Sequence, residues 1–156
     1  MEIHLGIGKK ALHEVCEKMN EFLADSYALY LKTQNFHWNV TGPEFFSLHL
    51  LFEKHYEDLA DAVDEVAERI RSLGGVAEAS FSIFHKRTSI PEPKKRVSAK
   101  QMIRELVEGH ETISRKCRPW IPLFQELKDE ASADLLIKRL GIHEKAAWML
   151  RAHLEK

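Results

Sequence analysis

The sequence predicts an all-α protein: a bundle of four long helices with a long connection between the second and the third. Over four long segments, apolar residues recur every three or four positions, the periodicity of an amphipathic helix. Glycine and proline interrupt this periodicity between segments, as at Gly42-Pro43 and Gly74-Gly75. Residues 74–97 carry no long helical pattern, and a connection of that length allows the second and third helices to run parallel.

Composition places the chain among globular proteins. It has 156 residues, of which 44% are hydrophobic and 30% charged, so one domain over residues 1–156 with its own core is expected. The sequence has no apolar run long enough to cross a membrane, and its start lacks the apolar core of a signal peptide, so a cytoplasmic location is expected. Cys16 and Cys117 occupy core-like helical positions, which favours buried thiols over a disulfide.

The first helix is expected over about residues 7–37. His37 lies eighteen residues after Met19, which is five helical turns, so both side chains point the same way. A histidine at the end of an apolar stripe is suited to a partly dry metal site. Gly42-Pro43 then break the chain, and Pro43 is well placed to begin the next helix. The apolar stripe comprises Leu12, Val15, Met19, Phe22, Ser26, Tyr30 and Thr33.

The second helix, expected over residues 44–73, carries two stripes side by side. At about 100° and 1.5 Å per residue, one stripe is apolar and the other interleaves imidazoles and carboxylates with alanines. Such nitrogen and oxygen ligands suit iron, although a solvated helix face is the alternative interpretation. The apolar stripe comprises Phe45, Leu48, Phe52, Tyr56, Leu59, Val63, Val66, Ile70 and Leu73. The second stripe comprises His49, Glu53, Ala60, Asp64, Ala67, Glu68 and Arg71.

The spacing along this second stripe predicts an oligomer. His49 and Asp64 are about 22 Å apart along the helix axis, so they cannot bind one ion within one helix. Two copies packed antiparallel about a twofold axis would bring His49 of one copy beside Asp64 and Glu68 of the other. An isologous dimer would make two such sites by symmetry.

The crossover and the third helix follow. A short helix is expected over residues 80–86. Ser98 and Gln101 form a capping-box pattern that opens the third helix. Pro119 and Pro122 do not suit a helix interior, so a kink or an early end is expected there.

The fourth helix is expected to begin near residues 129–131. Asp129, Glu130 and Asp134 gather negative charge there, which stabilises a helix N-terminus. Among the nine histidines, His110 and His143 lie on core stripes and are interpreted as structural, and His55 as a surface residue. The Glu-x-x-His motif of larger di-iron bundles is absent from the sequence, which disfavours an iron centre inside one bundle.

Two sequence runs carry a family resemblance. The run FHWNVTGPEFFSLHLLFE, continued by DEVAERIRSLGG, resembles the signature of the Dps family, the miniferritins. Trp38 and Trp148 also match, and the resemblance extends over nearly the whole chain. It implies a ferritin-like four-helix bundle, with a short helix in the crossover, that assembles into a hollow homo-dodecamer with twofold and threefold axes.

The resemblance also implies a function. The family oxidises Fe2+ with hydrogen peroxide, and sometimes dioxygen, stores the iron and protects against oxidative stress, so a ferroxidase is expected. Trp38 and Trp148 are candidates for passing or quenching electrons, with core packing as their default role. At the helix start, Asp129, Glu130 and Asp134 become candidates for an acidic pore that draws iron inward. The implied ligands are His37 and His49 of one subunit with Asp64 and Glu68 of its mate, and Glu53 at a further acidic position.

Two other functions stay open. One is a DNA-compacting architectural protein whose iron chemistry is secondary; the other is a helical cage without chemistry, which the presence of all four principal ligands disfavours. The net charge is −1 and neither end carries a long basic tail, so DNA binding is expected to be weak or absent at neutral pH. The basic run Lys94-Lys95-Arg96 is interpreted as a solvated loop.

Overall fold

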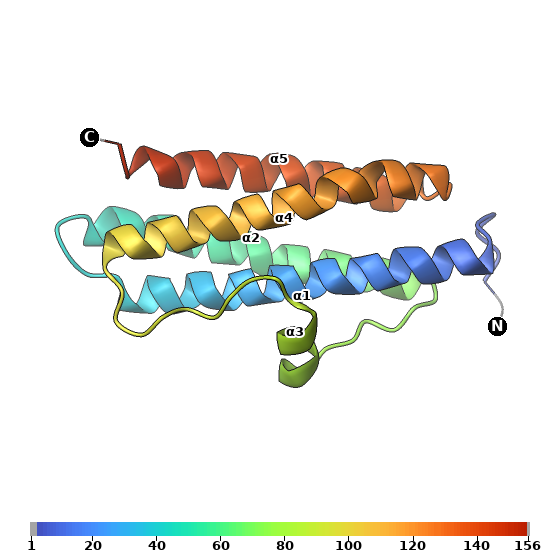
Figure 1. Ribbon diagram of the computed structural model, residues 1–156, viewed down its shortest axis with the longest axis horizontal. Helices are drawn as coiled ribbons and strands as arrows, with labels where there is room; N and C mark the ends of the chain where they lie inside the picture. The colour runs from blue at the N-terminus through green and yellow to red at the C-terminus, as the bar shows by residue number, and fades with distance from the viewer. Residues whose placement is uncertain (1–2, 156) are drawn as a thin grey trace.

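A computed structural model, which describes residues 3–155, shows a bundle of four long helices with a fifth, short helix on its outside (Figure 1). The described residues contain no strand, so the predicted all-α class is confirmed. None of the helices in this part of the chain is long and apolar enough to cross a membrane. The helices are α1 (Lys9–Asn39), α2 (Phe45–Ser72), α3 (Phe81–Arg87), α4 (Ala99–Glu126) and α5 (Glu130–Ala152).

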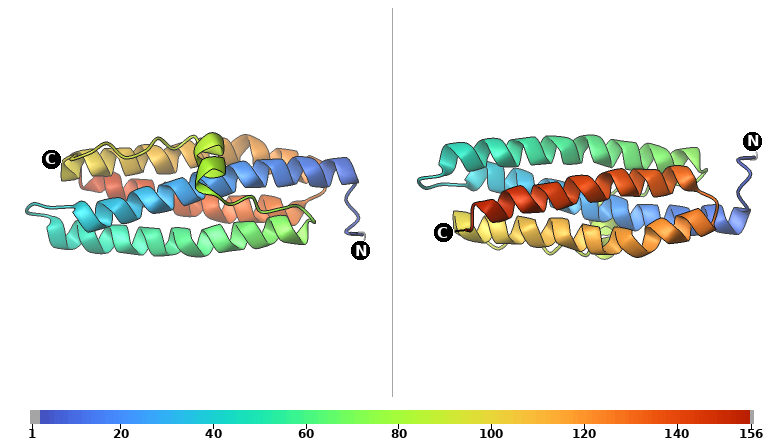
Figure 2. Two further views of the ribbon diagram at one scale, coloured as in Figure 1. Left: turned by 90° about the horizontal axis from the view of Figure 1, so that it is seen from below. Right: turned by 90° about the horizontal axis from the view of Figure 1, so that it is seen from above.

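The helices form two antiparallel pairs, α1 with α2 and α4 with α5 (Figures 1 and 2). The crossover from α2 to α4 travels back along the bundle, so α2 and α4 run parallel, as the length of the connection predicts. The short helix α3 sits within this crossover and packs against α1.

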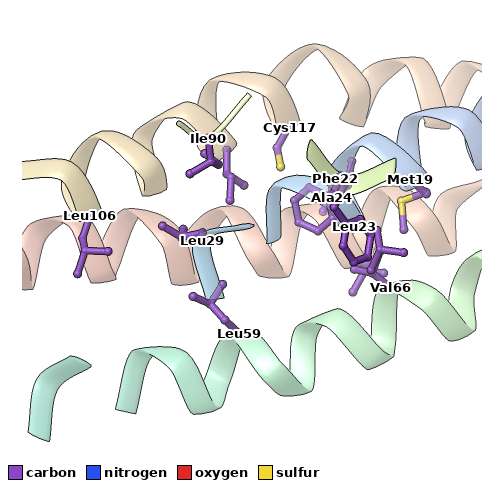
Figure 3. Packing of buried hydrophobic residues seen from close by; sticks show 14 of the residues in the cluster. Met19, Phe22, Leu23, Ala24, Leu29, Leu59, Val66, Ile90, Leu106 and Cys117 are labelled. Carbon is purple, nitrogen blue, oxygen red and sulfur yellow. The ribbon is translucent and has the colours of Figure 1, made fainter. Parts of the chain in front are cut away.

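The core lies along the axis of the bundle, where apolar side chains from the long helices interdigitate. Met19, Phe22 and Leu23 of α1 lie close to Val66 of α2, and Leu29 of α1 lies close to Leu59 of α2 (Figure 3). Each such buried side chain contributes about 1.5–3 kcal/mol to stability. The cysteines are free and buried, as predicted, and burial raises the pKa of the Cys117 thiol to about 12.

A buried carboxylate fixes the crossover to the bundle. Asp25 of α1 accepts hydrogen bonds from the Thr88 hydroxyl (3.0 Å), the Ser89 backbone N–H (2.6 Å) and the Lys116 ammonium (2.6 Å). Such charge-assisted bonds satisfy a carboxylate that would otherwise be costly to bury. One side chain thereby joins α1, the crossover and α4.

The sequence predicts a kink or an early end at the two prolines near the end of α4, and the structure excludes the early end. The helix continues through Pro119 and Pro122 to Glu126, so the expected early end is wrong. Both prolines face solvent, and so do Arg115 and Arg118, whose carbonyl groups lose their intrahelical partners. Water can hydrogen-bond these carbonyls, which explains why the helix tolerates both rings.

At the start of α4, the Ser98 hydroxyl accepts a hydrogen bond from the Gln101 N–H at 3.3 Å, which confirms the predicted cap. The Gln101 side chain instead donates to Glu105 at 3.4 Å, so only half of the capping box forms.

Candidate metal-ligand site

Two histidines far apart in sequence meet where α1 ends and α2 begins. The rings of His37 and His49 stack with centroids 3.8 Å apart and planes inclined by 19°. His37 Nδ1 lies 2.8 Å from the His49 carbonyl oxygen, and His49 Nδ1 lies 2.9 Å from the His37 carbonyl oxygen. Each residue therefore fixes the ring of the other, and the two sequence-predicted ligands are brought together.

This reciprocal pairing sets the tautomer of both rings. A carbonyl oxygen can only accept a hydrogen bond, so each Nδ1 carries the proton and donates it. Each Nε2 then keeps its lone pair and is available as a ligand. Protein histidines that bind metals are oriented in this way, through a hydrogen bond from their second ring nitrogen. In the neutral ring form, the Nε2 lone pairs of His37 and His49 are therefore the ones that a divalent cation can bind.

Aromatic rings enclose this histidine pair. Phe45 stacks on His49 with centroids 5.1 Å apart, and Tyr56 meets the His37 ring edge-on, also at 5.1 Å. Burial, followed by the charges of Glu53 and Glu57, raises the pKa of Tyr56. The sequence placed Phe45 and Tyr56 on the core stripe, but Phe45 is exposed. The contact of Tyr56 with the site had a sequence signal, because Tyr56 follows His49 by two helical turns.

The candidate carboxylates lie further along α2. Asp64 and Glu68 are exposed and Glu53 is half-buried, and within residues 3–155 no side chain pairs with any of them. Because α2 is continuous from Phe45 to Ser72, His49 and Asp64 remain about 22 Å apart along its axis. In the part of the chain that the structure describes, no three His, Cys, Asp or Glu side chains are grouped to hold a metal. One chain therefore brings the two histidines together, but not the carboxylates with them.

Exposed apolar side chains surround the same region. Trp38 is 63% exposed and Phe46 is 73% exposed, and Leu50 is exposed beside them on α2. Core packing, the default role considered for Trp38 and Trp148, is therefore wrong for this chain, because Trp148 is 61% exposed as well. Apolar side chains of this size concentrated on one face mark an interaction surface.

The three acidic residues at the start of α5 differ in burial and in their contacts. Asp129 is only 2% exposed: it caps the helix by accepting from the Ser132 N–H at 3.0 Å, and it forms an ion pair with Arg69 of α2. Its carboxylate is thus occupied by structural contacts, which supports the helix-start interpretation. Glu130 and Asp134 are exposed, and Asp134 lines a surface hollow that Glu68 also lines.

A second group of histidines, from α2, α4 and α5, lies inside the bundle. His55 is buried, so its interpretation as a surface residue is wrong, whereas His110 and His143 are buried as predicted. The Nδ1 atoms of His110 and His143 share a hydrogen bond of 2.9 Å. Burial lowers the pKa of His55 to about 4, that of His110 to about 3 and that of His143 well below its usual value.

Comparisons with known proteins agree with this architecture. The ferritin-like domain family matches residues 16–156. DNA protection during starvation protein 2 of Bacillus anthracis is 38% identical over 146 residues, covering 92% of this chain and 98% of that protein. DpsC from Streptomyces coelicolor has a TM-score of 0.96 at 31% identity, covering 100% of this chain and 92% of that chain. A Vibrio cholerae O1 DPS protein, described as a member of a broad superfamily of ferritin-like diiron-carboxylate proteins, has a TM-score of 0.93 at 32% identity, covering 99% and 98%. The chain therefore belongs to the Dps family of ferritin-like proteins.

Proposed function

We propose that this chain is a ferroxidase that oxidises and stores iron, with each Fe2+ site shared between two copies of the chain. The reciprocal pairing of His37 with His49 carries the proposal. It holds both Nδ1 atoms on backbone carbonyl groups and leaves both Nε2 atoms without a partner among the described residues, at the positions that the family resemblance assigns to iron ligands. A packing role alone would not require both rings to be held in the same tautomer.

The side chains on α2 support a metal site that is shared between two copies of the chain. Asp64 and Glu68 are exposed and unpaired among the described residues, so they are free to bind a cation beside the histidines of a second copy. Ala60 and Ala67 on the same stripe are small enough to allow a close approach of two α2 helices. Phe46, exposed near the start of α2, gives such an approach apolar area to bury.

The ligand set favours oxidation. Fe2+, the substrate, would bind through His37 and His49 of one subunit and Asp64 and Glu68 of its mate, with Glu53 helping to hold a second iron. Carboxylates are hard, anionic ligands, so they stabilise Fe3+ more than Fe2+. Hydrogen peroxide accepts two electrons, which two Fe2+ ions supply, and is reduced to water. Removing Fe2+ and peroxide together suppresses hydroxyl-radical formation and would protect a cell from oxidative stress.

Storage requires a closed assembly. The family resemblance supports a hollow homo-dodecamer in the cytoplasm, in which oxidised iron accumulates. Glu130 and Asp134 are exposed and unpaired among residues 3–155, so they are the carboxylates best suited to draw Fe2+ through a threefold pore. Asp129 would support that pore as a helix cap.

Anaerobic loading with Fe2+ followed by peroxide tests this function, read from the absorbance of the ferric product. The His37→Ala/His49→Ala variant should lose rapid oxidation. The matched control is His13→Ala/His85→Ala, which removes two exposed histidines away from the site. Oxidation by the ligand variant at the rate of the control would contradict the proposal.

DNA protection by direct binding is the second candidate. One relative is described as a DNA protection during starvation protein. Lys94, Lys95 and Arg96 form no ion pairs within the described residues, and they line a surface hollow of about 390 Å³. A gel-shift assay at low salt, run on the same preparation, separates this activity from iron oxidation.

A further inference from the structure

A surface hollow of about 220 Å³ is lined by residues of α2, α4 and α5 and reaches the inner histidines. A single water molecule needs roughly 15 Å³ of such space, so the hollow has room for a small organic molecule. The buried residues of its lining, His55 and His110, form its floor. The exposed residues Lys54 and Lys145 form its rim.

The floor of this hollow carries imidazole nitrogen atoms without hydrogen-bond partners. His55 is 7% exposed and His110 is 2% exposed, and neither His55 Nδ1 nor His110 Nε2 has a partner among the described residues. Buried polar atoms without a partner are rare in folded proteins, and each one needs an explanation. A ligand that hydrogen-bonds these nitrogen atoms from within the hollow provides that explanation.

His143 extends this polar floor deeper into the bundle. Its Nδ1 shares the 2.9 Å hydrogen bond with His110 Nδ1, and its Nε2 also has no partner among the described residues. In the neutral pair one Nδ1 donates and the other accepts, so one Nε2 carries a proton and the other carries a lone pair. By exchanging tautomers, the pair can present either a donor or an acceptor at His110 Nε2.

The charges around the hollow favour an anion over a metal ion. Burial, and then the charges of neighbouring groups that include the buried Arg139 guanidinium, lower the pKa of His110. Asp58, in the lining of the hollow, accepts two hydrogen bonds from Arg139, at 3.2 and 2.7 Å, and so balances that charge. Lys54 and Lys145 form no ion pair within the described residues. This excess of positive charge attracts an anion and repels a cation.

One wall of the hollow is apolar, and it indicates what kind of anion fits. Ile142, Ala146 and Met149 of α5 form this wall. Phosphate or another inorganic anion would leave the wall in contact with water, whereas the hydrocarbon chain of a small organic acid would cover it. The basic rim, the imidazole floor and the apolar wall together match a carboxylate with a short chain.

We propose that this hollow binds a small monocarboxylate together with one proton. The carboxylate passes Lys54 and Lys145, its chain covers the apolar wall, and its oxygen atoms hydrogen-bond the imidazoles of the floor. Its negative charge favours the charged form of His110, so His110 Nε2 takes up one proton from water and pairs with the carboxylate as an imidazolium. This binding goes beyond the proposed ferroxidase function, since no residue of the lining is a candidate iron ligand.

Isothermal titration calorimetry of the assembled, iron-free protein with butanoate tests the proposal. Titrations at pH 6 in two buffers with different ionisation enthalpies should show an uptake of about one proton for each butanoate bound. Between pH 6 and pH 7 the affinity should fall by up to about tenfold, because each carboxylate binds with a proton.

Three variants locate the site. Lys54→Met/Lys145→Met should weaken butanoate binding several-fold, because it removes the attraction at the rim. The matched control is Lys86→Met/Lys100→Met, which removes two exposed lysines of α3 and α4 and should leave the affinity unchanged. His110→Gln keeps a hydrogen-bonding side chain that cannot take up a proton, so the proton uptake should disappear and the affinity should no longer depend on pH.

Four outcomes would overturn the proposal. One is the absence of binding at pH 6 with millimolar butanoate. Another is binding of butanoate without proton uptake. The third is an equal loss of affinity in the rim variant and in its control, which would mean that the anion binds elsewhere on the surface. The fourth is an equal affinity for phosphate or for butanol, which would mean that charge alone or the apolar wall alone determines binding.

Discussion

Helix α2 presents histidines on two faces about 120° apart, and the surroundings of these histidines differ in the hydrogen-bond partner and in burial. On the outer face, His49 pairs with His37 through backbone carbonyl groups, which leaves both Nε2 atoms available. On the inner face, His55 lies beside His110 and His143, whose Nδ1 atoms bond to each other. The outer pair shares α2 with unpaired carboxylates that lie further along an exposed stripe, whereas the inner group is enclosed by one chain.

In these two groups, the hydrogen-bond partner of the second ring nitrogen determines whether a histidine can bind a metal. A carbonyl partner fixes the proton on Nδ1 and prepares Nε2 for a cation. An imidazole partner uses one nitrogen of each ring, and burial keeps the pKa of His110 and His143 low. The outer face is therefore suited to chemistry, while the inner group contributes polar contacts within the core.

Removing His37 and His49 should have the largest effect, because it should lower the rate of iron oxidation far more than it lowers stability. We expect His37→Ala/His49→Ala to slow peroxide-driven Fe2+ oxidation by about 100-fold or more, because outer-shell changes alone cost up to that factor. His37 is buried, His49 is half-buried and each loses one hydrogen bond to a backbone carbonyl group, so the unfolding free energy should fall by about 1–3 kcal/mol. Stopped-flow absorbance and denaturant unfolding of the same preparation measure both quantities. A variant that unfolds readily yet oxidises iron normally would show that the two histidines serve stability rather than iron oxidation.

At the acidic start of α5, neighbouring carboxylates should also differ in whether they contribute to stability or to iron handling. Asp129→Asn removes the buried carboxylate charge that pairs with the half-buried Arg69 guanidinium, so it should destabilise the fold by about 1–3 kcal/mol. Glu130→Gln/Asp134→Asn changes two exposed charges and should alter stability by no more than about 0.5 kcal/mol.

Growth of the ferric core provides the second readout for these residues. Glu130→Gln/Asp134→Asn should slow core growth while the number of tightly bound Fe2+ ions per subunit stays unchanged. An unchanged growth rate would show that these carboxylates serve only as charges at the start of the helix.

The inner histidines should make stability depend on pH. Their pKa is depressed in the folded state, so the unfolded chain takes up protons that the folded chain cannot. Stability is full above about pH 6.5 and falls as the pH drops toward 3, by up to about 1.4 kcal/mol per pH unit for each histidine.

The variant His110→Gln/His143→Gln tests this origin of the pH dependence. Glutamine does not titrate, so unfolding free energies measured between pH 6.5 and 4 should depend less on pH than those of the unmodified chain. Equal slopes would assign the acid sensitivity to carboxylates instead.

DNA binding is the smallest expected effect. The net charge is −1 and like charges repel, so plasmid mobility should not change at neutral pH in about 150 mM salt. Binding at low salt that disappears in Lys94→Ala/Lys95→Ala/Arg96→Ala would locate a weak surface contact. A clear shift at physiological salt would make the architectural function the leading one.

Much of the fold was predictable from local patterns, because apolar periodicity, glycine and capping residues act within a few positions. The helices, the parallel course of α2 and α4 and the cap at Ser98 follow from such patterns. The continuity of α4 through Pro119 does not follow from local patterns, because it depends on which face of α4 meets water. The burial of His55 was missed because it depends on how α4 and α5 pack against α2.

The candidate site was predictable only in part. Spacing and family resemblance identify His37, His49, Asp64 and Glu68 as a set. The exchange of hydrogen bonds between the two histidines and opposite carbonyls depends on how the end of α1 approaches the start of α2, which spacing does not encode. The occupation of Asp129 by Arg69 depends on a contact between residues sixty positions apart.

Reassembly of mixed oligomers tests the central claim, that each site takes histidines from one subunit and carboxylates from its mate. His37→Ala/His49→Ala and Asp64→Ala/Glu68→Ala chains are unfolded, mixed in equal amounts and reassembled, and Fe2+ oxidation is measured. Each variant alone should be inactive, but a mixed dimer has one intact site out of two, so random pairing should restore about one quarter of the unmodified activity. Verified mixed assemblies with no recovered activity would contradict a shared site.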